Sequence, residues 1–249
     1  MNAMDWGQSK RAFAGSIFSL LDRVEYRRIV EPDDFVEIAR LREQAYNSRT
    51  FIEADKFGPL VDDYDRMDDC YVIGVYVDEK LVSTVRIHVV SEDHLHGPVA
   101  SYFPHRAHEL VADGKRYIDP SRFAADGQAS WDYPLLPFIT LRAVSMAHTY
   151  FETENIAKVV RADTASFYKR SFGSVEVEPA QPVAHFAVPL AMLVAPDDEI
   201  RHRLNTRYRF FKSLPSEQRM MFAPEADLLF PSLTILPSAR LANAGSDWQ

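Results

Sequence analysis

Two consecutive runs of mostly apolar residues, Cys70–Val77 and Leu81–Val90, are separated only by Asp78-Glu79-Lys80. Apolar runs of this length with such a short polar connection predict two strands joined by these three residues. The first run is apolar on both faces, which favours a central position in a sheet. The second run carries Arg86 and His88 on one face and apolar side chains on the other. The fold is therefore expected to be built around a central sheet.

The patterns on either side of these two strands alternate between helix and strand. They predict a short helix at Arg11–Leu21, a strand at Val24–Val30, a helix at Asp33–Asn47, a strand at Tyr117–Ala124 interrupted by Pro120, a long helix at Leu135–Glu154, a strand at Lys158–Ala162, a helix capped by Asp163 and ending near Gly173, a strand at His185–Val194 and a helix at Asp197–Lys212. Residues 91–115 show little periodicity and are expected to form a long connection. This order predicts an α+β fold, with a single mixed sheet flanked by helices.

Length and composition are those of one globular domain. The chain has 249 residues, of which 47% are hydrophobic and 26% are charged. No apolar run approaches the roughly 20 residues of a membrane-spanning helix, and no secretory signal is expected. A single cysteine, Cys70, fits a reducing compartment, so we expect a cytoplasmic protein. The net charge of −8 argues against general nucleic-acid binding.

Three short segments concentrate charged and aromatic residues in the predicted sheet region. They read Asp62-Asp63-Tyr64-Asp65 followed by Tyr71, Val82-Ser83-Thr84-Val85-Arg86-Ile87, and Asp119-Pro120-Ser121-Arg122-Phe123. Arg42 and Tyr46 lie on the apolar stripe of the helix predicted before them. A guanidinium on an apolar stripe needs a partner, so Arg42 is expected to be paired.

Together these segments resemble the acyl-homoserine-lactone synthases and their relatives, the N-acyl amino acid synthases, which share the GNAT acyltransferase fold. A fourth segment, Ala165–Gly173, is similar to a wider GNAT pattern whose tyrosine protonates the departing thiolate. The resemblance covers about residues 24–195. It implies a GNAT-like acyltransferase domain over residues 1–195, with its core starting at about residue 24. Residues 196–249 are then expected to form a C-terminal helical extension packed on the same domain.

The resemblance implies an N-acyltransferase that moves a long-chain acyl group to the amine of an amino acid or a similar small molecule. The donor would be an acyl-carrier protein or acyl-CoA, with no permanently bound cofactor. The Gly-rich pyrophosphate loop of CoA-using GNAT enzymes is absent before the predicted long helix, which favours the carrier protein. The alternatives are an acyl-homoserine-lactone synthase that uses S-adenosylmethionine, an acetyl-CoA enzyme, and a non-catalytic acyl-binding or regulatory module.

The same resemblance suggests a role for individual side chains. The catalytic candidates are Asp119 as the base, Tyr168 as the acid, and Arg122. The candidates for substrate binding are Arg42, Tyr46, Asp62, Asp65, Arg86, Ser121 and Phe123. Arginines bind carboxylates bidentately, and an amino acid acceptor carries that group. The structural alternatives are that Asp119 only bridges to Arg122, that the charged residues form one buried ion network, and that Tyr168 is a packing residue.

Three further features have both a functional and a structural interpretation. Pro120 marks either an ordinary bulge or a place where neighbouring strands part and leave backbone groups for the pantetheine arm of the donor. Apolar residues of the long helix, such as Phe138, Leu141 and Met146, line either an acyl pocket or plain core. Histidines gather between His88 and His108, but no cysteine joins them and we expect no metal.

Overall fold

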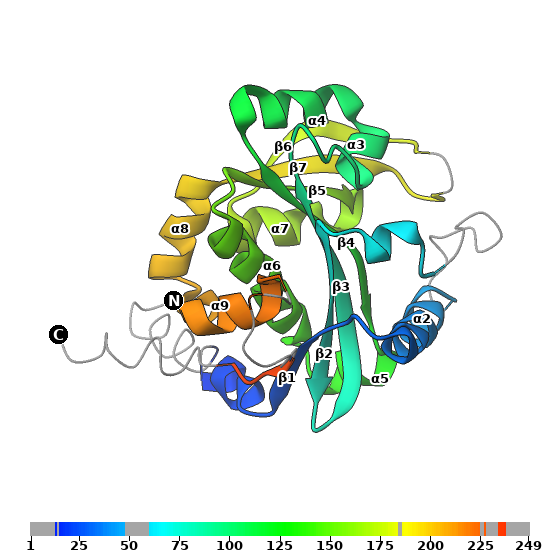
Figure 1. Cartoon of the computed structure of the whole chain (residues 1–249), viewed down its shortest axis with the longest axis vertical. Helices are drawn as coiled ribbons and strands as arrows, with labels where there is room; N and C mark the ends of the chain where they lie inside the picture. Colours follow the sequence, from blue (N-terminus) through cyan, green and yellow to red (C-terminus); the bar gives the residue numbers. More distant parts are fainter. Residues whose placement is uncertain are drawn as a thin grey trace, which may run out of the picture.

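The computed structural model describes residues 13, 15–47, 60–183, 186–224, 227 and 234–237. Helices and strands alternate along the chain (Figure 1). The strands are β1 (Val24–Arg28), β2 (Cys70–Val77), β3 (Lys80–Val90), β4 (Tyr117–Ala125), β5 (Asn155–Arg161), β6 (Val175–Gln181), β7 (Leu190–Pro196) and β8 (Thr234–Ile235). The helices are α2 (Pro32–Asn47), α3 (Pro98–Tyr102), α4 (Pro104–Val111), α5 (Gly127–Asp132), α6 (Leu136–Phe151), α7 (Ala165–Phe172), α8 (Asp197–Thr206) and α9 (Pro215–Phe222). Short 3-10 turns include η2 (Asp63–Arg66), η4 (Ala162–Thr164) and η5 (Arg209–Phe211).

Within the described residues the strands form one sheet in the order β6-β7-β5-β4-β3-β2-β1-β8. Neighbouring strands are antiparallel except β4 and β5, which are parallel. The two strands predicted around Asp78-Glu79-Lys80 form a hairpin inside this sheet, and its turn uses Asp78 and Glu79 at φ of 49° and 67°. Two consecutive residues of positive φ match the twist of a hairpin. The predicted α+β fold with a single mixed sheet is confirmed.

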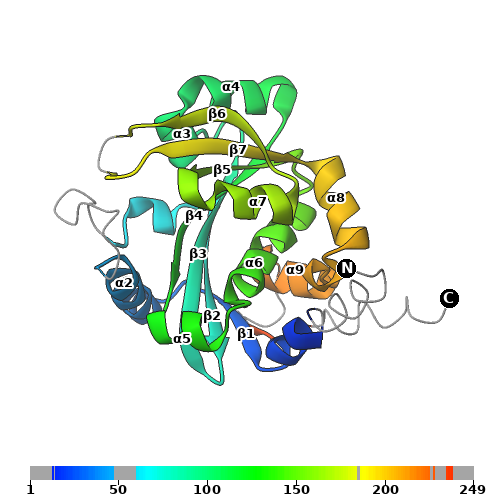
Figure 2. The ribbon, with the colours of Figure 1, turned by 180° about the vertical axis from the view of Figure 1, so that it is seen from behind.

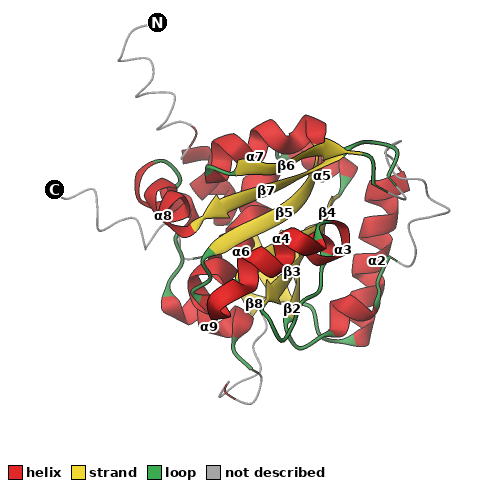
Figure 3. Ribbon diagram, turned by 90° about the horizontal axis from the view of Figure 1, so that it is seen from above, coloured by secondary structure: helices red, strands yellow, loops and turns green. Residues whose placement is uncertain are grey.

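The two faces of the sheet are covered by different helices, so that helices flank the strands on both sides (Figure 3). On one face α6, α7 and α9 pack against a core that includes Ile118 of β4 and Ile156 of β5. Figure 2 shows α6 and α7 lying over the strands on this side. On the other face, α3 and α4 pack near Tyr117 and Ala157, and α2 covers the central strands. We call these the α6 face and the α2 face.

Strands β4 and β5 separate almost as soon as they meet. Their pairing is limited to Tyr117 with Asn155 and Ile118 with Ile156. Beyond that point β5 stays paired with β7 up to Arg161, whereas β4 continues along β3. The interpretation that neighbouring strands part near Pro120 is therefore confirmed. It leaves a gap in the sheet that begins at the residue after Ile118.

Several elements differ from those expected. The prediction of an irregular connection over residues 91–115 is wrong, because α3 and α4 occupy much of it. The short helices α5 and α9 and the strand β6 were not anticipated. Asp163 does not cap α7; it lies in η4 and bonds Arg161, while the N-cap residue is Thr164. The predicted positions Arg11 and His185 lie outside the described residues.

The segment after β7 completes the core of the α6 face. Side chains from η5 and α9 join this core, namely Phe210, Phe211, Met221 and Phe222. Arg142 of α6 is fully buried and fixes the segment in place. It donates hydrogen bonds to the carbonyls of Phe210 and Lys212 at 3.2 and 2.9 Å and to the Glu217 carboxylate at 2.9 Å. None of the described helices is long and apolar enough to cross a membrane.

Candidate active site

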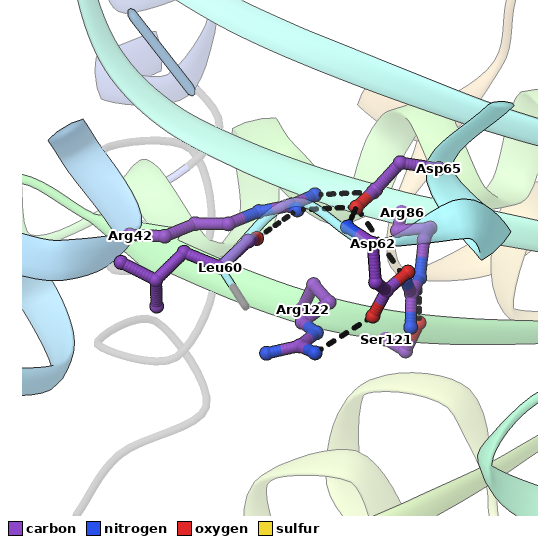
Figure 4. A network of polar contacts seen from close by, with 7 residues as sticks. All are labelled: Arg42, Leu60, Asp62, Asp65, Arg86, Ser121 and Arg122. Carbon is purple, nitrogen blue, oxygen red and sulfur yellow. Dashed lines mark hydrogen bonds and ion pairs between the residues drawn. The ribbon is translucent and has the colours of Figure 1, made fainter. Parts of the chain in front are cut away.

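An ion pair between Arg42 of α2 and Asp65 of η2 forms the inner end of a polar cluster on the α2 face (Figure 4). Both N–O distances are 3.0 Å, and both side chains are 0% exposed. Arg42 Nη1 also donates to the carbonyl of Leu60 at 2.7 Å. The bidentate pairing with Asp65 and the bond to the Leu60 carbonyl together satisfy most of the N–H donors of the guanidinium. A charge on the buried side of a helix requires such partners.

Asp62 extends this cluster toward solvent by joining two more arginines (Figure 4). Its carboxylate accepts from Arg86 at 2.5 Å and from Arg122 at 2.8 Å. Arg86 also donates to the hydroxyl of Ser121 at 3.1 Å. The backbone N–H of Asp62 donates to Asp65 at 3.0 Å, so the inner and outer parts form one network. The sequence candidates Arg42, Asp62, Asp65, Arg86, Ser121 and Arg122 therefore meet at one place.

A bulge in β4 explains how Ser121 and Arg122 reach the same side of the sheet. Consecutive residues of a regular strand point to opposite faces. Here the pairing shifts between Thr84 and Arg86 of β3, so that one residue of β3 faces two residues of β4. Arg122 has a φ of 52°, a left-handed conformation that is uncommon outside glycine. Strain of this kind persists where the surroundings hold the residue, and it clusters at functional sites.

The two aromatic candidates lie on opposite faces. Tyr46 of α2 is buried beside Ala124 on the α2 face, and burial raises the pKa of its hydroxyl. Phe123 packs instead against the core of the α6 face. The structure therefore brings Tyr46 near the ion network and separates Phe123 from it.

Asp119 is the first residue of β4 beyond its pairing with β5, and it is 0% exposed. Its Oδ2 atom accepts the backbone N–H of Val99 at 2.8 Å, while Oδ1 bonds to no described residue. Burial raises the pKa of this carboxyl to about 7, against lowering contributions from the Val99 N–H, Arg86 and Lys158. The alternative that Asp119 bridges to Arg122 is wrong, because Arg122 bonds Asp62 instead.

His88 is a member of this site that sequence reasoning did not single out. It is the direct cross-strand partner of Asp119 and is 0% exposed. Neither ring nitrogen bonds to a described residue, and burial lowers the pKa of the imidazole to about 3, so the ring is neutral. The sequence did place His88 two residues after Arg86, on the same face of the strand. Gly97 packs against both side chains: a Cβ there would lie 2.9 Å from Asp119 Oδ2 and 3.4 Å from the His88 ring.

Replacing Gly97 with alanine should therefore damage both stability and activity. Gly97 has φ of 110° and ψ of 176°, a region open essentially only to glycine, which costs other residues about 1–3 kcal/mol. The new methyl group also has to displace Asp119. Urea denaturation and a turnover assay measure the two effects. Gly114→Ala is the control, since Gly114 also has positive φ (73°) but open space around it. Equal activity in both variants would contradict the importance of this contact.

Lys158 of β5 is a second residue missed at the sequence level. It is 2% exposed and lies on the α6 face, where its ammonium is 5.6 Å from the ring centroid of Tyr168 and 5.5 Å from that of Phe172. Its hydrogen bond to the Ile156 carbonyl is long, at 3.5 Å. Burial lowers the pKa of this amine to about 7, and Asp119 opposes that shift. Burial also raises the pKa of the Tyr168 hydroxyl to about 12.

The remaining candidates take ordinary places. Rings of His88, His94 and His96 lie near one another, but among the described residues no three His, Cys, Asp or Glu side chains form a group that could hold a metal ion. Leu141 and Met146 are buried in the core of the α6 face. Phe138 packs in an aromatic cluster with Phe13, Phe167, Tyr208, Phe210 and Phe211.

Comparison with known protein families identifies the segment that holds these residues. A family model described as N-acyl amino acid synthase FeeM matches residues 37–196, which is more than half of the chain. This segment runs from the start of the ion network through both sides of the gap between β4 and β5. No curated protein sequence matches the chain.

Several solved structures share the fold. FeeM, an N-acyl amino acid synthase from uncultured soil microbes, is 16% identical, with a TM-score of 0.61 over 72% of this chain and 94% of that chain. The AHL synthase LasI is 14% identical, with a TM-score of 0.51 over 72% and 94%. The CoA-dependent acyl-homoserine lactone synthase BjaI, solved with SAM and isopentyl-CoA, is 15% identical, with a TM-score of 0.51 over 73% and 88%. At these sequence identities, the similarity to the three structures shows a shared fold.

Proposed function

Because the chain belongs to the FeeM family of N-acyl amino acid synthases, we propose that it transfers a long-chain acyl group from an acyl-carrier protein to the amine of an amino acid. The chain is an acyltransferase with the GNAT fold. The observation that carries the finer proposal is the position of Asp119. It is a buried carboxylate at the edge of the gap between β4 and β5, on the same face as a network of three arginines.

The gap supplies the binding mode for the donor. An extended pantetheine arm carries amide groups, and the separated backbones of β4 and β5 can pair with them as a strand adds to a sheet edge. The same backbone N–H groups are the candidates for stabilising the oxyanion of the tetrahedral intermediate.

The region before α6 supports a carrier protein rather than free acyl-CoA. Helix α5 occupies Gly127–Asp132, and α6 then begins at Leu136 with a proline in its first turn. Proline has no backbone N–H, and this stretch contains no glycine-rich loop to surround a pyrophosphate.

The outer part of the ion network suits an acceptor that carries a carboxylate. Arg86 and Arg122 lie on the α2 face with Asp119, and Arg122 retains 12% of its side-chain surface exposed. Guanidinium groups recognise carboxylates bidentately. Arg42 and Asp65 are fully enclosed, so their contribution is to hold Asp62 and η2 in place.

In this arrangement Asp119 accepts the proton that the amine loses as it forms the amide. A base works best when its pKa lies near the operating pH. Burial brings the pKa of Asp119 to about 7, close to the reference value of ≈ 7.7–8.0 for an α-amine. Val99 holds one carboxylate oxygen and leaves the other for the acceptor.

Product analysis tests this proposal. Purified protein is incubated with long-chain acyl-carrier protein or acyl-CoA, the proteinogenic amino acids and S-adenosylmethionine, and small-molecule products are identified by mass spectrometry. We expect an N-acyl amino acid, formed faster from the carrier protein. An acyl-homoserine lactone would reassign the acceptor. Absence of product with every donor, together with retained acyl binding, would replace the proposal with a non-catalytic acyl-binding module.

A further inference from the structure

Lys158 is a buried cation that no acidic side chain contacts in the described structure. It is 2% exposed, and its ammonium lies against the Tyr168 and Phe172 rings and donates to the Ile156 carbonyl. A buried ammonium is costly unless it is paired, and a lysine rather than a methionine at such a place calls for an explanation. Packing alone does not supply one.

The position of Lys158 along β5 supplies the explanation. The last residue of β5 that pairs with β4 is Ile156, so Lys158 follows it by two residues and borders the gap. Asp119 borders the same gap from β4, one residue after Ile118. The acidic group whose charge raises the pKa of Lys158 is Asp119. β4 and β5 are neighbours in the sheet, so no strand lies between these two residues.

The two groups lie on opposite faces of the sheet. Asp119 shares the face of Tyr117 and is held by Val99 of α3. Lys158 shares the face of Ile156 and lies against the rings of α7. A thioester carbonyl placed in the gap would thus have a carboxylate on one face and an ammonium on the other.

We propose that Lys158 is the catalytic acid of the acyl transfer, donating a proton to the sulfur of the departing thiol. The inference rests on the proposed function and adds the group that completes it. The amine attacks the thioester carbon from the α2 face and gives one proton to Asp119. The C–S bond then breaks, its electron pair goes to sulfur, and a proton from the Lys158 ammonium forms the S–H bond. Products are the amide and the thiol, and a proton passing from Asp119 to Lys158 restores both groups.

The competing acid, Tyr168, is less suited to this step. A thiol has a reference pKa of about 8.5. The Tyr168 phenol, whose pKa is about 12, is a weaker acid than this thiol and so a poor proton donor to its thiolate. The Lys158 ammonium, with a pKa of about 7, is the stronger. Tyr168 instead covers the ammonium with its ring and keeps water away from it.

The test compares Lys158→Met with the wild type on two donors of the same acyl chain. One is the acyl-pantetheine thioester, whose alkyl thiolate needs a proton to leave. The other is the thiophenyl ester, whose thiolate is far less basic and leaves without one. The acceptor is the amino acid that gives product in the assay above. We expect kcat to fall by roughly 10²–10⁴-fold with the pantetheine donor and by less than about 10-fold with the thiophenyl donor.

Two further variants complete the design. Lys169→Met removes an exposed lysine of α7 and should leave both rates unchanged. Tyr168→Phe removes the hydroxyl of the competing acid and keeps the ring over the ammonium, and a loss with the pantetheine donor as large as that of Lys158→Met would assign the acid to Tyr168 and overturn the inference. An equal loss with both donors in Lys158→Met would assign Lys158 to oxyanion stabilisation or packing, and an unchanged rate with pantetheine would remove it from catalysis; either result overturns the inference. A wild type that transfers from neither donor would instead overturn the proposed function.

Discussion

Replacing Asp119 with asparagine should lower kcat by roughly 10²–10⁴-fold and, at the same time, make the folded protein more stable above neutral pH. Asparagine keeps the shape of the side chain and can still accept the Val99 N–H. It cannot take the proton of the attacking amine. The loss of activity therefore follows from the missing proton acceptor, and the gain of stability follows from removing a buried ionisable group.

The sign of the stability effect follows from the pKa of Asp119. Burial raises this pKa from 3.8 to about 7 on folding. Such a group contributes stability that is fully present below its unfolded pKa and is lost as pH rises through its folded pKa. Asparagine does not titrate, so the variant should gain on the wild type between about pH 4 and pH 7, by up to roughly 4 kcal/mol. The ammonium of Lys158 across the gap offsets part of this gain.

Urea denaturation at several pH values and a turnover assay provide the two measurements. Asp113→Asn is the matched control, because the Asp113 side chain is 84% exposed and pairs with Lys115, whose side chain is also exposed. It should change neither quantity by much. A fall of stability together with activity in Asp119→Asn would show that Asp119 is structural.

Replacing Arg42 with methionine should destabilise the fold by about 3–5 kcal/mol. The variant leaves the fully buried carboxylate of Asp65 without its bidentate partner, although Arg86 remains 3.5 Å away. It also frees the Leu60 carbonyl. The double variant Arg42→Met/Asp65→Leu should recover most of the loss, since it removes both charges from the interior.

Arg23→Met provides the comparison for this effect. Arg23 pairs with Asp78 at the surface, where the side chains are 47% and 59% exposed. Surface ion pairs contribute at most about 1 kcal/mol, so this variant should melt near the wild type. Thermal and urea denaturation of the four proteins measure the differences. A loss in Arg42→Met no larger than that in Arg23→Met would refute the claim that the inner pair supports the site.

The parts of the fold that the sequence predicted are those with long periodic patterns. β2, β3, α2, β4 and α6 have apolar patterns long enough to identify. Pro120 had two interpretations, and the structure contains both the separation of β4 from β5 and a bulge in β4. Helix α3 has five residues and α4 has eight, too few for periodicity to be visible. Each begins with a proline in its first turn, a signal that was available in the sequence. The polar strand β6 has little buried surface to mark it.

The candidate site divides in a similar way. Arg42 and Arg86 stood out as charged residues in apolar patterns, whereas Asp62, Asp65 and Arg122 were identified through the family resemblance of short motifs. His88 and Lys158 were not, because what makes them notable is burial next to partners far away in the chain. Their importance depends on the meeting of β3 with β4 and on the gap beside β5. Such relations arise only from tertiary structure.

The contacts of Arg142 have a consequence for engineering. The stretch that matches the FeeM family model ends at residue 196, yet Arg142 within that stretch is satisfied by Phe210, Lys212 and Glu217 beyond it. An expression fragment cut at the end of the match would remove these three oxygen acceptors and leave the buried guanidinium its contact with the sulfur of Met146. A chimaera that took its C-terminal part from a relative would face the same mismatch. Exchange of parts between members of this family should therefore treat α6 and the segment after β7 as one module.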